Sequence, residues 1–144
     1  MFEVTKKNNK TYVKLNADTA NIGPLAELVE EFGKKFLSDE DAYNMAVSVD
    51  EAVTNIILHA YKDNNQGEIF VQVFDNEDEV GIQIEDYSEK FIPPVMVEKK
   101  KFTFDKLEEG GLGLYLMQEF MDELRFLYDE HEKKNIILMK KYLI

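Results

Sequence analysis

The chain has 144 residues, 44% apolar and 32% charged, a balance that predicts one folded domain spanning residues 1–144. The absence of cysteine excludes disulfides and thiolate metal sites, and a net charge of −12 argues against DNA or RNA binding, because an acidic surface repels phosphates. No apolar run reaches the roughly 20 residues of a membrane-spanning helix, and the charged, alternating N-terminus does not resemble a signal peptide, so we expect a soluble cytoplasmic protein.

The first part of the chain predicts a hairpin followed by two helices. The segments FEVTKK and TYVKLNA alternate apolar and polar residues on either side of KNNK, as two strands joined by a turn would. From Ile22 to Leu37 apolar residues recur every three or four positions, which predicts a helix with Pro24 in its first turn. Ser38 and Asp41 resemble a capping box, so a second helix is expected from there to about Tyr61.

The second part predicts two more hairpins separated by a loop and a helix. EIFVQVFD and EVGIQIED alternate across the turn NED, and LRFLYDE and IILMKKYLI flank the turn HEKKN. Between them, Tyr87–Glu109 has no steady period and predicts a long loop, whereas Gly111–Glu123 predicts a third helix. Its inward-facing residues are expected to be Leu112, Leu116, Phe120 and Met121. The whole succession predicts an α+β fold, a two-layer sandwich in which a mixed, largely antiparallel sheet is covered on one face by about three helices.

A polar stripe is expected on the second helix, where Glu51, Asn55 and His59 follow one another at intervals of four residues. The other faces of this helix are apolar, so the stripe should need partners other than water. An Asn side-chain oxygen suits Mg²⁺, and a Glu one turn away can accept a proton from an attacking hydroxyl. On spacing alone a solvated helix face is the simpler interpretation, and we assign His59 a structural role at the helix end.

Two further features have chemistry that suits a nucleotide. Asp86 ends a predicted strand, where its carboxylate can accept a hydrogen bond from the amine of adenine, although taken alone it is more simply a turn residue. Gly110, Gly111 and Gly113 open the third helix, where glycine lets the backbone approach a triphosphate and the helix dipole favours negative charge. They form neither a Walker A loop nor a dinucleotide fingerprint. Together with the acid–amide pair, these features predict a nucleotide site.

Three segments carry a family resemblance. DEAVTNIILHAY resembles the N box of the gyrase, histidine-kinase and mismatch-repair ATPase superfamily, which has the Bergerat ATP-binding fold, and more closely that of its anti-sigma-factor serine/threonine kinase branch. EDYSEKF resembles the first glycine box of that branch, usually Asp-x-Gly-x-x-Phe, and GGLGLYLMQEFMDEL resembles the second. The ending NIILMKKYL is also typical of these domains, so the resemblance covers nearly the whole chain.

The resemblance implies roles for individual residues. Glu51 would be the general base, Asn55 the magnesium ligand, and Asp86 the residue that binds the adenine amino group. The segment from about residue 91 to 109 would be the nucleotide lid. The implied nucleotide-binding positions are Asn55, Asp86, Ser88, Phe91, Gly110, Gly111, Leu112 and Gly113.

The resemblance also implies a function, with one departure from the family pattern. The chain would be an ATP- and Mg²⁺-dependent serine/threonine kinase that phosphorylates a small anti-anti-sigma-like protein, sequesters a sigma factor or another regulator, and forms a homodimer. Ser88 stands where the family normally has glycine, and it would either narrow the adenine pocket or replace a contact usually made through water. This departure supports the alternative, a non-catalytic nucleotide-binding or protein-sequestering module of the same fold. The catalytic part of a sensor histidine kinase is disfavoured, because the chain opens with strands and not with a helical hairpin bearing a phosphoacceptor histidine.

Overall fold

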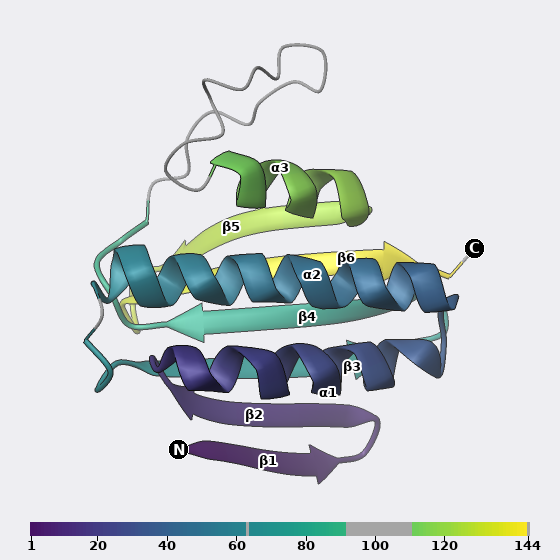
Figure 1. Cartoon of the computed structure of the whole chain (residues 1–144), viewed down its shortest axis with the longest axis horizontal. Coiled ribbons are helices and arrows are strands. Elements are labelled where there is room, and N and C mark those ends of the chain that lie inside the picture. Colours follow the sequence, from purple (N-terminus) through teal and green to yellow (C-terminus); the bar gives the residue numbers. More distant parts are fainter. Residues whose placement is uncertain (63, 92–110, 144) are drawn as a thin grey trace.

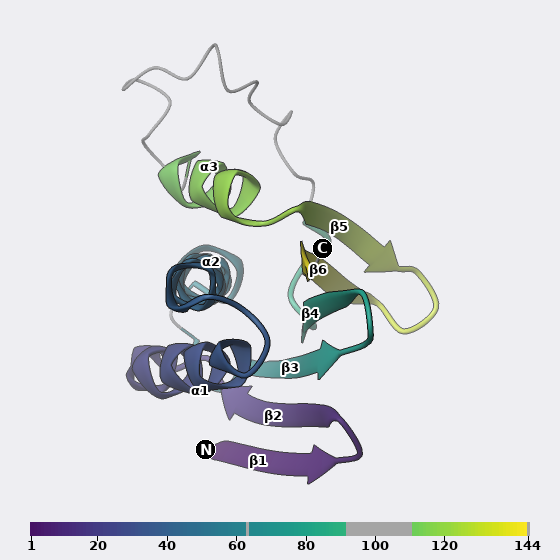
Figure 2. The same ribbon diagram turned by 90° about the vertical axis from the view of Figure 1, so that its right-hand side faces the viewer.

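The computed structural model describes residues 1–62, 64–91 and 111–143, and in them a sheet forms one layer and helices form the other (Figures 1 and 2). The strands are β1 (Phe2–Lys7), β2 (Lys10–Asn16), β3 (Glu68–Asp75), β4 (Glu79–Asp86), β5 (Glu123–Asp129) and β6 (Lys134–Tyr142). The α-helices are α1 (Ile22–Lys34), α2 (Asp39–Asn55) and α3 (Gly111–Phe120), with short helical turns η1 (Thr19–Asn21) and η2 (Ile56–Ala60). The predicted α+β sandwich with helices on one face is confirmed.

The six strands lie in the order β1-β2-β3-β4-β6-β5, and every neighbouring pair is antiparallel. The expectation of a mixed sheet is therefore wrong for the described strands. β5 does run in the same direction as β4, but β6 lies between them, because the closing hairpin places its second strand against β4. β4 and β5 are therefore never hydrogen-bonded neighbours, and the described sheet contains no parallel pair.

The core lies between the sheet and the helices. Alternation along the strands points one side chain in two toward the helices, so that Val13, Val71, Ile84 and Ile137 face each other across four strands in register. The helices contribute buried residues at intervals of three or four, and Met121 follows directly after α3: Leu25, Val29, Met45, Val49, Val53, Leu114, Met117 and Met121.

The buried side chains of α3 differ from the prediction at Leu116 and Phe120, whereas the predicted burial of Met121 is confirmed. Leu114 and Met117 are buried with Met121, whereas Leu116 and Phe120 are only half-buried. The side chain of Leu112 lies outside the described residues. The helix also ends at Phe120, so Glu123 belongs to β5. The apolar sequence LGLYLMQEF allows several helical stripes, and packing against α2 decides which one is buried.

The junction between α1 and α2 shows why α1 stops at Lys34, one turn short of the predicted Leu37. The amides of Phe36 and Leu37 both donate to the carbonyl of Gly33, which closes the helix end. Ser38 then adopts an extended conformation, and its hydroxyl accepts from the Asp41 amide at 3.1 Å, as the capping pattern predicts.

The last turn of the second helix is a π-turn. α2 continues into η2 and ends near Tyr61, as predicted, but the Tyr61 amide donates to the Ile56 carbonyl five residues earlier. Within the described residues no helix is both long and apolar enough to cross a membrane.

Candidate functional site

Glu51 and Asn55 lie one turn apart on α2, and both side chains are half-buried. The residues between and beyond them, Ala52, Val53 and Ile56, are buried in the core. Withdrawal from water raises the pKa of Glu51 above its usual value of 4.5, and the neighbouring Asp50 carboxylate adds to the rise. A carboxylate made more basic in this way is suited to accepting a proton.

The first turn of α3 lies directly against this pair. A Cβ atom added at Gly113 would stand 2.7 Å from Oε2 of Glu51 and 3.4 Å from Nδ2 of Asn55. Only glycine lets the helix approach this closely without displacing the carboxylate. The structure thus brings Gly113 together with the acid–amide pair, although they are about sixty residues apart in sequence. Gly111 begins the helix, while Gly110 lies outside the described residues.

His59 lies in the π-turn that follows Asn55, and its side chain is exposed. Glu51 and Asn55 are half-buried, so they differ from His59 in their access to water.

Asp86 is the last residue of β4, and its side chain is 3% exposed on the helix-facing side of the sheet. Its Oδ1 atom accepts from the Ser88 amide at 3.0 Å, from the Ser88 hydroxyl, and from Nδ2 of Asn135 at 3.1 Å. Among the described residues no hydrogen bond reaches Oδ2. The carboxylate is thus held by one oxygen, and the other is left to accept from a ligand.

Ser88 and Phe91 continue the segment that Asp86 begins. The Ser88 hydroxyl donates to Oδ1 of Asp86, which also accepts from two other donors, and not to Oδ2. The Phe91 amide donates to Oδ1 of Asn135 at 2.7 Å, and its half-exposed ring packs 5.5 Å from that of Phe126. Sequence reasoning missed Asn135. The available signal was an Asn at an inward position of an otherwise apolar alternating strand.

Tyr61 connects the end of the second helix to the ends of two strands. Its hydroxyl donates to the Glu68 carbonyl at 2.8 Å and accepts from the Tyr87 amide at 2.9 Å. Its ring covers Gly67, where an added Cβ would stand 2.5 Å from a ring carbon. The end of η2, the end of β4 and the start of α3 lie at the same end of the sandwich (Figure 1). Tyr61 therefore fixes Asp86 relative to the helix that carries Glu51 and Asn55.

Two surface hollows lie beside this region and not within it. One of about 420 Å³ is on the uncovered sheet face, and one of about 440 Å³ adjoins Tyr61; both include Phe70 and Tyr87. Neither is lined by Glu51, Asn55 or Asp86. The segment predicted as the lid, apart from Phe91, lies outside the described residues. Within 1–62, 64–91 and 111–143, no three His, Cys, Asp or Glu side chains gather closely enough to hold a metal ion.

Comparisons with known proteins place the chain in a family. Residues 15–141 match the model of the histidine kinase-like ATPase domain. The serine-protein kinase RsbW of Bacillus subtilis is 31% identical, over 95% of this chain and 89% of that protein. RsbW of Oceanobacillus iheyensis is 33% identical, over 83% and 75%. RsbW of Bacillus licheniformis is 39% identical over 100 residues, and there the chain spans only 61% of the relative's length.

A solved structure shows the same fold. The chain superposes on the structure of the RsbU and RsbW domains of a Mycobacterium tuberculosis protein with a TM-score of 0.65 at 15% identity. The match covers 94% of this chain and 33% of that one. The expected family is confirmed: the chain belongs to the histidine kinase-like ATPase family, in the branch of the RsbW serine-protein kinases.

Proposed function

We propose that the chain is an ATP-dependent protein serine/threonine kinase of the anti-sigma-factor type, which phosphorylates a small anti-anti-sigma-like protein. The observation that carries this proposal is the contact of Gly113 with Glu51 and Asn55, in a chain of an ATPase family. It places the start of a helix, where phosphates bind well, beside a carboxylate and an amide. The name of its relatives, serine-protein kinase, supports a hydroxyl as the acceptor.

ATP would lie between the end of β4 and the start of α3. Oδ2 of Asp86 would accept the hydrogen bond of the adenine amine, because Oδ1 already has three donors. Ser88 and Phe91 would border the adenine. The backbone of the segment Gly110, Gly111, Leu112 and Gly113 would face the phosphates, where the helix dipole and free amides favour negative charge.

Asn55 would hold the magnesium ion through its side-chain oxygen. The donor chemistry fits, because Mg²⁺ prefers hard oxygen ligands and takes few of them from the protein. The close approach of Gly113 fits too, because a side chain there would occupy the space next to the Asn55 amide. A magnesium ion held there would neutralise part of the phosphate charge.

Glu51 would act as the general base. Its carboxylate takes the proton of a partner's serine or threonine hydroxyl while that oxygen forms a bond to the γ-phosphorus. The bond from the γ-phosphorus to the bridging oxygen breaks, and ADP leaves with the electron pair. Partial burial makes Glu51 more basic than an exposed glutamate, which favours the proton transfer.

The family resemblance supports three further parts of the proposal. The kinase would sequester a sigma factor or another regulator, it would act in the cytoplasm, and it would form a homodimer. These parts rest on the match to the RsbW branch.

Transfer of labelled phosphate from ATP to the anti-anti-sigma-like proteins of the source organism, assayed one by one, tests the proposal. Glu51→Gln and Asn55→Ala should each lower transfer by about 100-fold or more. Glu40→Gln and Asn44→Ala, the same substitutions earlier on α2, should leave transfer unchanged. A chain that binds Mg-ATP and its partner yet transfers nothing would instead be the non-catalytic module.

A further inference from the structure

Asn135 is a buried polar residue that no part of the proposed function uses. It lies on β6 at the position paired with Asp86 of β4, and it is only 4% exposed. This pair is at the last position of the β4–β6 ladder. Beyond it the chain leaves the sheet, so the polar backbone groups of residues 87–91 need partners other than a neighbouring strand.

The Tyr61 hydroxyl accepts from the Tyr87 amide and Asp86 accepts from the Ser88 amide, and the Asn135 side chain supplies further partners. Its Oδ1 atom accepts from the Phe91 amide at 2.7 Å. Its Nδ2 atom donates to Oδ1 of Asp86 at 3.1 Å and to the Glu89 carbonyl at 3.0 Å, with longer contacts to Ser88 at 3.2 and 3.4 Å. One amide thus ties both ends and the middle of the segment 86–91. These hydrogen bonds require a donor and an acceptor on the same side chain, which an ionised aspartate or an aliphatic residue does not have.

Two side-chain contacts at the surface hold this segment less firmly than the Asn135 amide does. Lys90 forms an ion pair with Glu130 at 2.8 Å, but both side chains are well exposed, and exposed pairs contribute little. Phe91 packs on Phe126 while half of its own surface stays in solvent. The Tyr61 hydroxyl holds only the Tyr87 amide, so the buried amide of Asn135 is the main restraint on residues 88–91.

We propose that Asn135 is a positioning residue of the nucleotide site: by bonding Oδ1 of Asp86 and the backbone of residues 88–91, it orients Asp86 so that Oδ2 is presented to the adenine. This inference rests on the proposed function for its ligand. It also assigns a purpose to Ser88, whose hydroxyl joins the same group of hydrogen bonds and does not block the free oxygen.

The test combines ADP affinity, measured by calorimetry, with hydrogen exchange of the Phe91 amide, measured without nucleotide. In Asn135→Ala that amide should exchange about tenfold faster or more, and ADP should bind about tenfold more weakly or worse. Asn135→Asp keeps the shape and the acceptor but turns a second carboxylate toward Asp86, so ADP affinity should fall at least as far.

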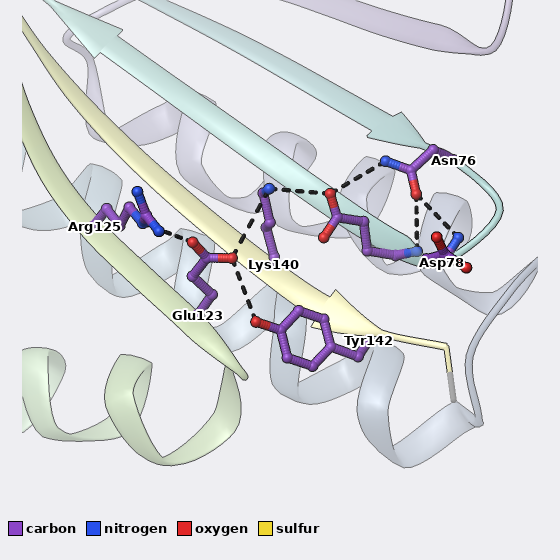
Figure 3. Close-up of polar contacts among 7 residues, drawn as sticks. Asn76, Asp78, Glu123, Arg125, Lys140 and Tyr142 are labelled. Atoms are coloured by element: carbon purple, nitrogen blue, oxygen red, sulfur yellow. Dashed lines mark hydrogen bonds and ion pairs between the residues drawn. The ribbon is translucent and has the colours of Figure 1, made fainter.

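Asn76→Ala is the matched control. Asn76 lies in the turn at the opposite end of β4, and its side chain makes three hydrogen bonds, accepting from the amides of Asp78 and Glu79 and donating to the Glu79 carboxylate (Figure 3). Its removal should change neither ADP affinity nor Phe91 exchange by more than about twofold.

The outcomes separate this inference from the proposed function. If the parent and both Asn135 variants bind ADP equally well, Asn135 does not position the site. Unchanged exchange at Phe91 in Asn135→Ala would likewise overturn the inference. If the parent itself does not bind ADP, the proposed function fails, and the exchange measurement still decides whether Asn135 holds the segment.

Discussion

Replacement of Gly113 by alanine should separate stability from catalysis. The new Cβ would stand 2.7 Å from Oε2 of Glu51, where ordinary contact begins near 3.4 Å, so the carboxylate must move by about 0.7 Å. The end of a glutamate side chain moves easily, and alanine favours a helix over glycine by up to about 1 kcal/mol. The free energy of unfolding should therefore change by less than about 1 kcal/mol.

Catalysis should respond differently to the same change. A displacement of about 1 Å at a reacting group can cost about 100-fold in rate. The variant should lose about 10- to 100-fold in kcat for phosphate transfer, while its urea denaturation midpoint stays close to that of the parent. Gly23→Ala is the control, since Gly23 lies in the first turn of α1 with no atom within 4 Å of the added Cβ.

Two results would refute this reasoning. If Gly113→Ala transfers phosphate at the parental rate, α3 does not constrain Glu51 in the working enzyme. If Gly113→Ala instead lowers the free energy of unfolding by several kcal/mol, as a substitution in the core would, the added Cβ collides with rigid backbone and not with the flexible end of a side chain.

Three further predictions concern the neighbouring residues. Tyr61→Phe removes two hydrogen bonds but keeps the ring over Gly67, so urea unfolding should show a loss of about 1–3 kcal/mol, and calorimetry a lower ADP affinity. Glu51→Gln should stabilise the fold at about pH 7 more than at about pH 4, as urea unfolding at both would show. The raised pKa means that the ionised side chain costs stability as pH rises through and above 4.5, and equal gains at both pH values would contradict this. Ser88→Gly should weaken ADP binding about fivefold in a titration, because it removes a donor to Asp86; tighter binding would show that Ser88 narrows the pocket.

Local sequence signals predicted most of the fold because each element is locally specified. The β3–β4 hairpin has strict alternation on both sides of a polar turn, and its predicted bounds agree with the structure. The start of α2 was predictable because Ser38 caps it through a bond to the nearby Asp41 amide. The buried stripe of α3 was not predictable, because leucines at 112, 114 and 116 give a helix several apolar faces. Which face is buried depends on contact with α2, a tertiary choice.

The candidate site shows the same division. The placement of Glu51 and Asn55 one turn apart on a helix was predictable because helical spacing is a local property. The close approach of Gly113 to Glu51 was not predictable, because it joins residues about sixty positions apart in sequence. Asn135 was missed because its importance comes from strand pairing with Asp86, forty-nine residues earlier. The π-turn after Asn55 was not predicted, because the helical spacing of apolar residues continues through it.

The central claim is that Asn55 on α2 and Asp86 on β4 serve one nucleotide. Calorimetric titration of the parent, Asn55→Ala and Asp86→Ala with ADP, in the presence and absence of Mg²⁺, tests it most directly. We predict that Asp86→Ala weakens binding in both conditions, because the adenine contact does not depend on the metal. Asn55→Ala should remove only the gain in affinity that Mg²⁺ gives the parent. Parental affinity in both variants, with the same response to Mg²⁺, would contradict the account.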